Sequence, residues 1–123
     1  MITVPAFILR RLYVKQSLRN NERGFEFQLM NRLGSGYAHR LLPLTVDGLE
    51  MPAERSSFVM DGSETSFADV SEENTFTLSM NKSITVKVEG TTLEPGPRKV
   101  AMGFEVPGLG TLKFDFTDVV AGE

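Results

Sequence analysis

Three neighbouring side chains, Tyr37, His39 and Arg40, are the residues of this sequence whose types best suit chemistry. They follow two glycines in the stretch LGSGYAHR, and His39 is the only histidine of the chain. Histidine exchanges a proton near neutral pH, so His39 is the natural base for a serine or threonine nucleophile in a chain without cysteine. LGSGY does not match the GxSxG pattern that exposes a nucleophilic serine. We therefore expect a polar loop here rather than a self-contained catalytic triad.

A second polar stretch, DGSETSFADVSEE, has the spacing of a calcium-binding loop. Oxygen-bearing side chains occur at its positions 1, 3, 5, 9 and 12, which are Asp61, Ser63, Thr65, Asp69 and Glu72. Position 6 is Ser66, however, where the sharp turn of such a loop requires glycine. We therefore expect no metal site in this chain. Neither a pair of acids in a cleft for sugar chemistry nor a glycine-rich phosphate loop is indicated by the sequence.

The elements that must position these residues are predicted to be β-strands. Apolar and polar residues alternate in GFEFQLMN, SITVKVEG and TLKFDFTD, and less cleanly in YVKQSLRN. A period of two places every second side chain on one face, so each stretch predicts a strand with one buried face. Further strands are expected near residues 44–46, 57–60, 76–80 and 100–106. Only SFADVSEEN predicts a helical turn, and a short one.

Turn signals separate these predicted strands. VDGL and MDGS each contain Asp-Gly, which is the strongest short signal for a β-hairpin. NNERG, LEPGPRK and VPGLGT predict further chain reversals. Eight or nine short strands with a turn about every 8–12 residues are typical of an all-β fold. We predict a single-domain antiparallel β-sandwich that covers residues 1–123.

Composition and charge limit the function. The chain is 41% hydrophobic and 24% charged, which is ordinary for a soluble domain. No apolar run approaches the ~20 residues of a membrane span, and the apolar patch at the start precedes its arginines, unlike a signal peptide. We therefore expect a cytoplasmic protein without a membrane partner. The net charge of −3 argues against nucleic-acid binding.

The charge is unevenly distributed along the chain. Residues 1–40 contain seven basic and two acidic residues, whereas the remainder contains six basic and fourteen acidic residues. Solvated strand faces would explain this pattern. A basic patch that docks an acidic partner surface is the alternative.

Three longer stretches, taken in order, resemble a known family. They are GFEFQLMN, then LLPLTVDGLEMP, then DVSEENTFTLSMNKSITVKVEGTTLEPGPRKVAMGFEV. Together they are similar to the small β subunit of bacterial C-glycoside deglycosidases over roughly residues 12–120. In that family GFxF starts a strand, VDG with a following proline forms a hairpin, and an LxPGxH-like turn leads into a paired strand. Arg98 stands here where the family usually has histidine, and NRLGSGYAHR and MGFEVPGLGT replace its YYRG and RISYMP-like segments.

This resemblance implies a non-catalytic subunit of a hetero-oligomer. The partner would be a sugar-isomerase-like barrel, the α subunit, which holds a divalent metal, manganese or magnesium, and the acid and base groups. That enzyme cleaves the carbon–carbon bond between a 3-oxo sugar and its aglycone by proton abstraction and elimination. The resemblance also implies that Tyr37, His39 and Arg40 lie at the partner interface or at the rim of its pocket, and that this chain binds no cofactor of its own.

Two alternatives from other classes remain open at this point. One is a stand-alone, self-associating β-sandwich that serves as a binding or scaffold protein. The other is a small hydrolase centred on His39, for which the fold alone is no argument.

Overall fold

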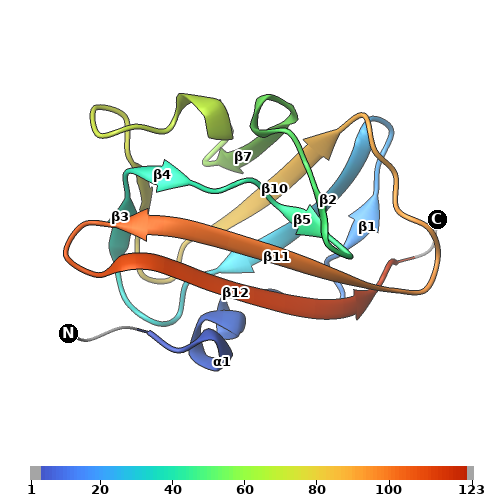
Figure 1. The fold of residues 1–123 in the computed structure, drawn as a ribbon, viewed down its shortest axis with the longest axis horizontal. Helices are drawn as coiled ribbons and strands as arrows, with labels where there is room; N and C mark the ends of the chain where they lie inside the picture. The colour runs from blue at the N-terminus through green and yellow to red at the C-terminus, as the bar shows by residue number, and fades with distance from the viewer. Residues whose placement is uncertain (1–3, 122–123) are drawn as a thin grey trace.

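The computed structural model describes residues 4–121, which form two antiparallel sheets packed face to face (Figure 1). The first sheet contains, in spatial order, β1 (Arg19–Asn20), β2 (Gly24–Met30), β10 (Ser83–Glu89), β7 (Ser56–Met60) and β8 (Ser63–Ser66). The second contains β12 (Gly110–Val119), β11 (Pro97–Val106), β5 (Thr45–Val46) and β6 (Leu49–Glu50), and β4 (Arg40–Leu41) also pairs with β11. A third, small sheet pairs β3 (Gly36–Ala38) with β9 (Phe76–Leu78). The predicted all-β sandwich is confirmed.

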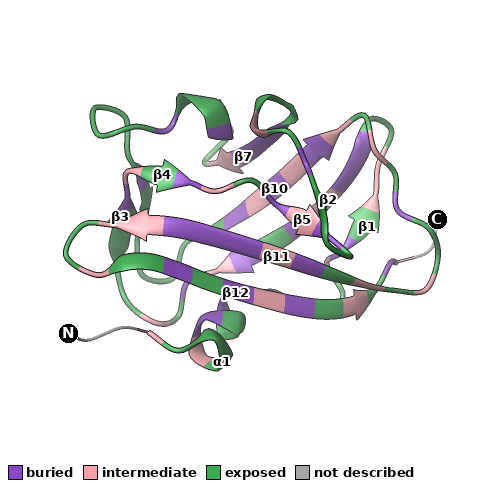
Figure 2. Ribbon diagram, in the orientation of Figure 1, coloured by how far each residue is buried: buried purple, intermediate pink, exposed green. Residues whose placement is uncertain are grey.

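Alternating apolar residues build the core between the sheets. On β2, Phe25, Phe27 and Leu29 are fully buried, and Phe27 lies opposite Val86 of β10 in the strand register. Phe116 of β12 faces them from the second sheet, with its ring centroid 5.2 Å from that of Phe27. Figure 2 shows the resulting alternation of buried and more exposed positions along the strands. Each such side chain contributes roughly 1.5–3 kcal/mol by leaving water.

Both Asp-Gly signals form the hairpins that the sequence predicts. Asp47 and Gly48 have φ values of 51° and 86°, and Asp61 and Gly62 have φ values of 52° and 83°. Left-handed conformations at both central residues define the type I′ turn, whose twist matches that of the flanking strands. These turns connect β5 to β6 and β7 to β8.

The region before β1 differs from the prediction. The structure has a short helix α1 (Ala6–Leu9) followed by the 3₁₀ turn η1 (Arg10–Leu12), where the sequence indicated no helix. Two further 3₁₀ turns, η2 (Ala53–Arg55) and η3 (Phe67–Asp69), occur later, and η3 is the helical turn predicted in SFADVSEEN. Four helical residues are too few to show a period of 3.6 in the sequence. Burial of Leu9 and Leu12 in the core holds α1 and η1 against the sandwich.

The predicted strand in YVKQSLRN is wrong over most of its length. Only Arg19 and Asn20 belong to a strand, because the chain bends at Gln16, whose φ of 69° is left-handed. The preceding segment instead crosses from β12 to the edge of β2, where the Val14 N–H donates to the carbonyl oxygen of Gln28. Within residues 4–121, no helix is long and apolar enough to cross a membrane.

Candidate functional site

The structure separates the three predicted site residues into two environments. Tyr37 lies on β3, is half exposed, and borders an apolar cavity. His39 and Arg40 face Glu105 of β11 instead, with nitrogen–oxygen distances of 3.6 Å for His39 and 4.0 Å for Arg40. Among the described residues, no hydrogen bond joins the His39 imidazole to a serine or threonine hydroxyl. The geometry thus contains no His39-centred triad, and a role of these residues at a partner interface stays a prediction.

The calcium-like spacing does not produce a metal centre. Asp61 forms the β7–β8 turn and accepts hydrogen bonds of 3.1 Å from Lys82 Nζ, whereas Asp69 belongs to η3. Within the part of the chain that the structure describes, no group of three or more histidine, aspartate or glutamate side chains could hold an ion. Asp61 lies in a hairpin turn and Asp69 in a 3₁₀ turn, so these residues do not form the single continuous loop that carries the ligands of an EF-hand.

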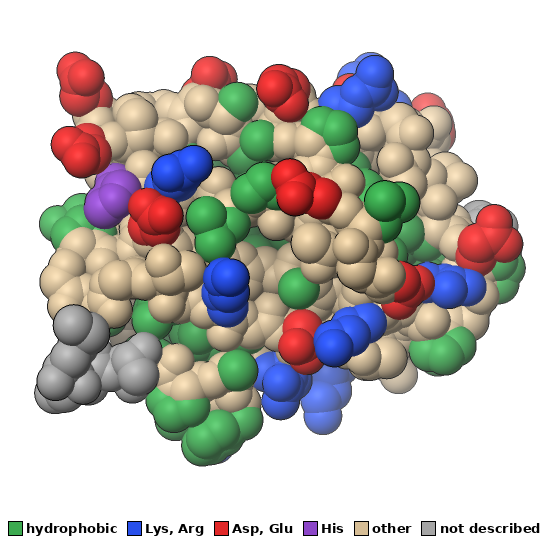
Figure 3. Space-filling model, in the orientation of Figure 1, with side chains coloured by type: hydrophobic (Ala, Val, Ile, Leu, Met, Phe, Trp, Pro, Cys, Tyr) green, Lys and Arg blue, Asp and Glu red, His purple; other side chains and the backbone are tan. Residues whose placement is uncertain are grey.

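A recess lined by several charged side chains lies elsewhere, between the α1–η1 segment and the end of β12. We call it the cationic cleft. Its volume is about 620 Å³, and it is lined by Phe7, Arg10, Arg11, Tyr13, Lys15, Gln16, Phe116, Thr117 and Asp118. In Figure 3, Lys and Arg side chains gather along the lower edge of the molecule, beside the place where Figure 1 shows α1 below β12.

A stacked aromatic pair forms the floor of this cleft. The Tyr13 ring lies on the Phe116 ring, with centroids 3.6 Å apart and an angle of 9° between their planes. The Tyr13 hydroxyl donates a 2.7 Å hydrogen bond to Asp118 Oδ2 and accepts one of 3.2 Å from the Leu18 N–H. Burial, followed by the bond to Asp118, raises the pKa of Tyr13 to about 12. The phenol is therefore a fixed, neutral donor at physiological pH and not an acid or base.

Both carboxylate oxygens of Asp118 accept hydrogen bonds from the protein itself. Burial acts to raise the pKa of its carboxyl, but hydrogen bonds from the Tyr13 hydroxyl and from the Gln16 and Val119 N–H groups outweigh that effect and lower the pKa. The charge of Lys15 acts in the same direction. Asp118 is thus ionised at neutral pH, and donors from the chain itself satisfy its oxygens.

The cations of the cleft differ in their partners. Arg10 is held against β12, since its Nε donates to the Asp115 carbonyl oxygen and its Nη2 lies 3.5 Å from Asp115 Oδ1. Within residues 4–121, Arg11 and Lys15 form no ion pair, and both are exposed. Two positive charges therefore point toward solvent beside the exposed ring of Phe7, of which 65% of the surface is accessible.

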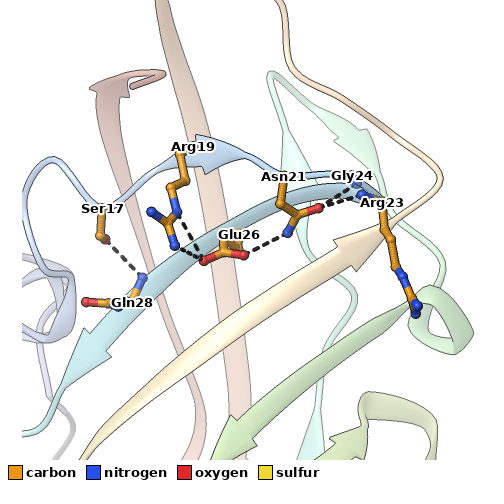
Figure 4. A network of polar contacts seen from close by, with 7 residues as sticks. All are labelled: Ser17, Arg19, Asn21, Arg23, Gly24, Glu26 and Gln28. Atoms are coloured by element: carbon orange, nitrogen blue, oxygen red, sulfur yellow. Dashed lines mark hydrogen bonds and ion pairs between the residues drawn. The ribbon is translucent and has the colours of Figure 1, made fainter. Parts of the chain in front are cut away.

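In the β1–β2 hairpin, by contrast, the positive side chains contact acidic groups, and Figure 4 shows part of this network. Arg19 Nη2 donates to Glu26 Oε2 at 2.9 Å, and Asn21 Nδ2 donates to the other Glu26 oxygen at 2.8 Å. Arg23 lies 3.6 Å from the Glu89 carboxylate. Burial acts to raise the pKa of the Glu26 carboxyl, yet the bonds from Asn21 and Arg19 lower it overall. The cations of this hairpin are thus neutralised by their neighbours.

The structure is thus an antiparallel β-sandwich with a cationic cleft between the α1–η1 segment and the end of β12. The sequence matches the family described as hydroxymethylglutaryl-CoA reductase, N-terminal domain, over residues 8–121. This chain belongs to that family. No curated protein matches the chain.

This finding corrects the resemblance drawn from the sequence. The chain is not a C-glycoside deglycosidase β subunit, and the lyase reaction and the role in carbohydrate metabolism implied by that resemblance are wrong as well. The motifs that carried it were chiefly turns, VDG and LEPGPRK, and such turns occur wherever hairpins must close. The barrel-type α subunit and its manganese or magnesium ion were implied by that resemblance alone, and both stay predictions.

Arg98 illustrates why those turn motifs misled. Its guanidinium Nη1 lies 3.1 Å from Asp47 Oδ2, and its other nitrogens donate to the carbonyl oxygens of Glu94 and Pro95. Asp47 Oδ1 also accepts from the Lys99 N–H, and these bonds, that from Lys99 first, hold the pKa of Asp47 below its usual range. Two turns are thereby joined to each other, which is a structural role that needs no shared activity.

Sequence reasoning missed the cationic cleft. Its signal was present in FILRRLYVK, where two aromatic residues and three cations occur within nine residues. The sequence shows the excess of positive charge in residues 1–40, but it does not show which cations have acidic partners.

Proposed function

We propose that this chain is a non-catalytic binding domain whose cationic cleft holds a coenzyme A thioester for a separate catalytic unit. The family name describes enzymes that reduce hydroxymethylglutaryl-CoA, and a coenzyme A thioester carries several phosphate charges, an adenine ring and a slender acyl arm. The observation that carries the proposal is the pair of unpaired cations, Arg11 and Lys15, beside the exposed Phe7 ring in a cleft of about 620 Å³.

The chemistry of the cleft fits such a ligand. Guanidinium and ammonium groups are the preferred partners of phosphate oxygens, and charge-assisted bonds are roughly twice as strong as neutral ones. An exposed aromatic face such as that of Phe7 offers a stacking surface for a base. The cleft volume falls within the range of about 300–1,000 Å³ that is usual for small-molecule sites.

The remaining groups of the cleft favour binding over chemistry. Tyr13 is held protonated, and Asp118 is held ionised with its oxygens occupied. His39 is not among the residues that line the cleft. We therefore propose that the groups that reduce the thioester belong to a partner, and that the two work as a hetero-oligomer.

The direct test is a calorimetric titration of the purified chain with hydroxymethylglutaryl-CoA, coenzyme A and pantetheine, which lacks the phosphates. Hydroxymethylglutaryl-CoA and coenzyme A should bind with similar affinity, and pantetheine about a hundredfold more weakly, because two charge-assisted contacts are lost. The affinity should also fall as salt is raised. Equal binding of pantetheine and coenzyme A, or no binding of either, would overturn the proposal.

We also propose a cytoplasmic location. The support is the absence of cysteine, which is compatible with a reducing compartment because no disulfide is needed for the fold. Fractionation of cells that express the tagged protein tests this, and recovery from a secreted or membrane fraction would contradict it.

A further inference from the structure

A second recess, which we call the apolar cavity, lies at the end of the sandwich that carries β3, β9 and the β11–β12 turn (Figure 1). Its volume is about 410 Å³. The α1–η1 segment closes one side, the strands β3 and β9 another, and the ends of β11 and β12 a third. The cavity is therefore bounded by elements from distant parts of the sequence.

The walls of the apolar cavity are part of the hydrophobic core. Seven apolar side chains that line it have exposed fractions of 6% or less: Leu9, Leu12, Ala38, Phe76, Leu78, Phe104 and Leu112. Partly buried Val4, Leu33, Val106 and Leu109 pack against them nearer the mouth. The recess is open to solvent at its mouth, so an apolar guest that fills it would remove apolar surface from water.

The side chains of Asn31 and Ser35, two polar residues at the cavity, already have hydrogen-bond partners. The Asn31 side chain donates to the carbonyl oxygens of Gly34 and Leu78 and accepts from the N–H groups of Leu33 and Gly34. Ser35 Oγ accepts a 2.9 Å hydrogen bond from the Met80 N–H. Within the described residues, no buried side-chain nitrogen or oxygen lacks a partner. A charged group would have to lose its hydration here without replacement, so the chemistry of the walls selects a neutral guest.

The apolar cavity and the cationic cleft use opposite sides of the same segment. Ile8, Leu9 and Leu12 of α1 and η1 face the cavity, whereas Arg10 and Arg11 face the cleft. Removal of the cleft's charges should therefore leave the cavity intact. The two sites can be tested independently of each other.

We propose that the apolar cavity is a binding site for a neutral aliphatic molecule of about the size of 1-octanol. Its volume of about 410 Å³ lies within the range of about 300–1,000 Å³ that is usual for small-molecule sites. The aliphatic character follows from the walls, where leucine, isoleucine and valine outnumber aromatic residues. This site is separate from the proposed coenzyme A site and does not depend on it.

The test follows the methyl signals of isoleucine, leucine and valine by NMR while 1-octanol is added to the intact chain. The signals of Ile8, Leu33 and Leu109 should shift, whereas that of Leu93, in the β10–β11 connection at the opposite end of the sandwich, should not. Octanoate, which has the same chain but a charge, should bind at least about tenfold more weakly. The Arg11→Gln/Lys15→Gln double variant should bind 1-octanol as the natural chain does.

Two substitutions fill the cavity without adding charge. Leu109→Trp acts from the β11–β12 turn, where the half-buried residue has room to accept a larger side chain, and Ala38→Met acts from β3. Each should reduce 1-octanol affinity about tenfold or more while the folded spectrum is retained. If Ala38→Met fails to fold, Leu109→Trp alone decides.

Three results would overturn the proposal. They are an absence of shifts at the cavity methyl groups, an equal affinity for octanol and octanoate, and an affinity that Leu109→Trp leaves unchanged. A chain that dimerises through this end and excludes octanol would assign the cavity to a second copy, which also contradicts a small-molecule site.

Discussion

The β1–β2 hairpin and the α1–η1 segment both lie in the basic first third of the chain, but their positive side chains differ in whether they form ion pairs. In the hairpin, Arg19 contacts Glu26 and Arg23 contacts Glu89. Beside α1 and η1, Arg11 and Lys15 form no ion pair within the described residues, although the charge of Lys15 helps to lower the pKa of Asp118. A count of charges therefore says little about binding, since pairing decides which cations are available to a ligand.

The largest expected effect is on the floor beneath the unpaired cations. Phe116→Ala removes the ring that stacks on Tyr13 and contacts Phe27, so the free energy of unfolding should fall by about 3–5 kcal/mol. Denaturant unfolding measures this value. An equally truncating change at the exposed Phe7, Phe7→Ala, should cost less than about 1 kcal/mol. Similar losses for the two variants would show that the floor is not a rigid part of the core.

A smaller loss of stability is expected when the hydroxyl of Tyr13 is removed. Tyr13→Phe keeps the stacked ring but leaves Asp118 and the Leu18 N–H without their partner, which should cost about 1–3 kcal/mol. Tyr37→Phe is the matched control and should be neutral, since Tyr37 is half exposed.

The Tyr13 hydroxyl also gives a signature at high pH. Its pKa in the folded protein is about 12, above the ordinary 10.0, so its contribution to stability is complete below pH 10 and is lost as the pH rises through 12. The unfolding free energy should fall over that window in the natural chain and less steeply in Tyr13→Phe. An identical decline in both proteins would contradict the assigned pKa.

At low pH the expected loss of stability comes from the hairpin carboxylate Glu26. The pKa of Glu26 is lowered from an ordinary 4.5, so its contribution is present above that value and is lost as the pH falls below it. Glu26→Gln should therefore destabilise the chain by about 1 kcal/mol at pH 7 and flatten the loss of stability below pH 4.5. Urea unfolding between pH 7 and pH 3 tests both effects, and Glu22→Gln, an exposed residue of the same hairpin, is the control.

The smallest effect on stability is expected at the unpaired cations. Arg11→Gln/Lys15→Gln should change the free energy of unfolding by no more than about 0.5 kcal/mol, because neither side chain makes an ion pair in the described structure. Thermal unfolding at low and moderate salt measures this. A loss well above that value would mean that these cations serve the fold and not a ligand.

The sequence predicted the parts of the fold that depend on local pattern. Alternation located β2, β10 and β12, and the two Asp-Gly pairs located the type I′ turns, because period and turn chemistry are written in adjacent residues. More strands exist than the eight or nine expected, since two-residue strands such as β4 and β6 are too short to alternate. The bend at Gln16 and the four-residue helix α1 depend on tertiary packing and left no such pattern.

The candidate site was predictable to a smaller extent. The stretch around Tyr37 was singled out, and Tyr37 does border a cavity, but its neighbours His39 and Arg40 turn toward Glu105. The cationic cleft was missed because it depends on hydrogen bonds from Tyr13 and Gln16 to Asp118, which lies about a hundred residues away in sequence. Such long-range pairing is invisible to spacing rules, and a resemblance based on turns could not supply it.

One measurement tests the central claim most directly, namely the affinity for coenzyme A of two double variants that remove the same charge from the two regions. Arg11→Gln/Lys15→Gln should weaken binding at least about a hundredfold, whereas Arg19→Gln/Arg23→Gln should weaken it less than about threefold. Equal weakening by both variants would contradict the account, because it would mean that coenzyme A responds to the overall charge of the chain and not to the cleft.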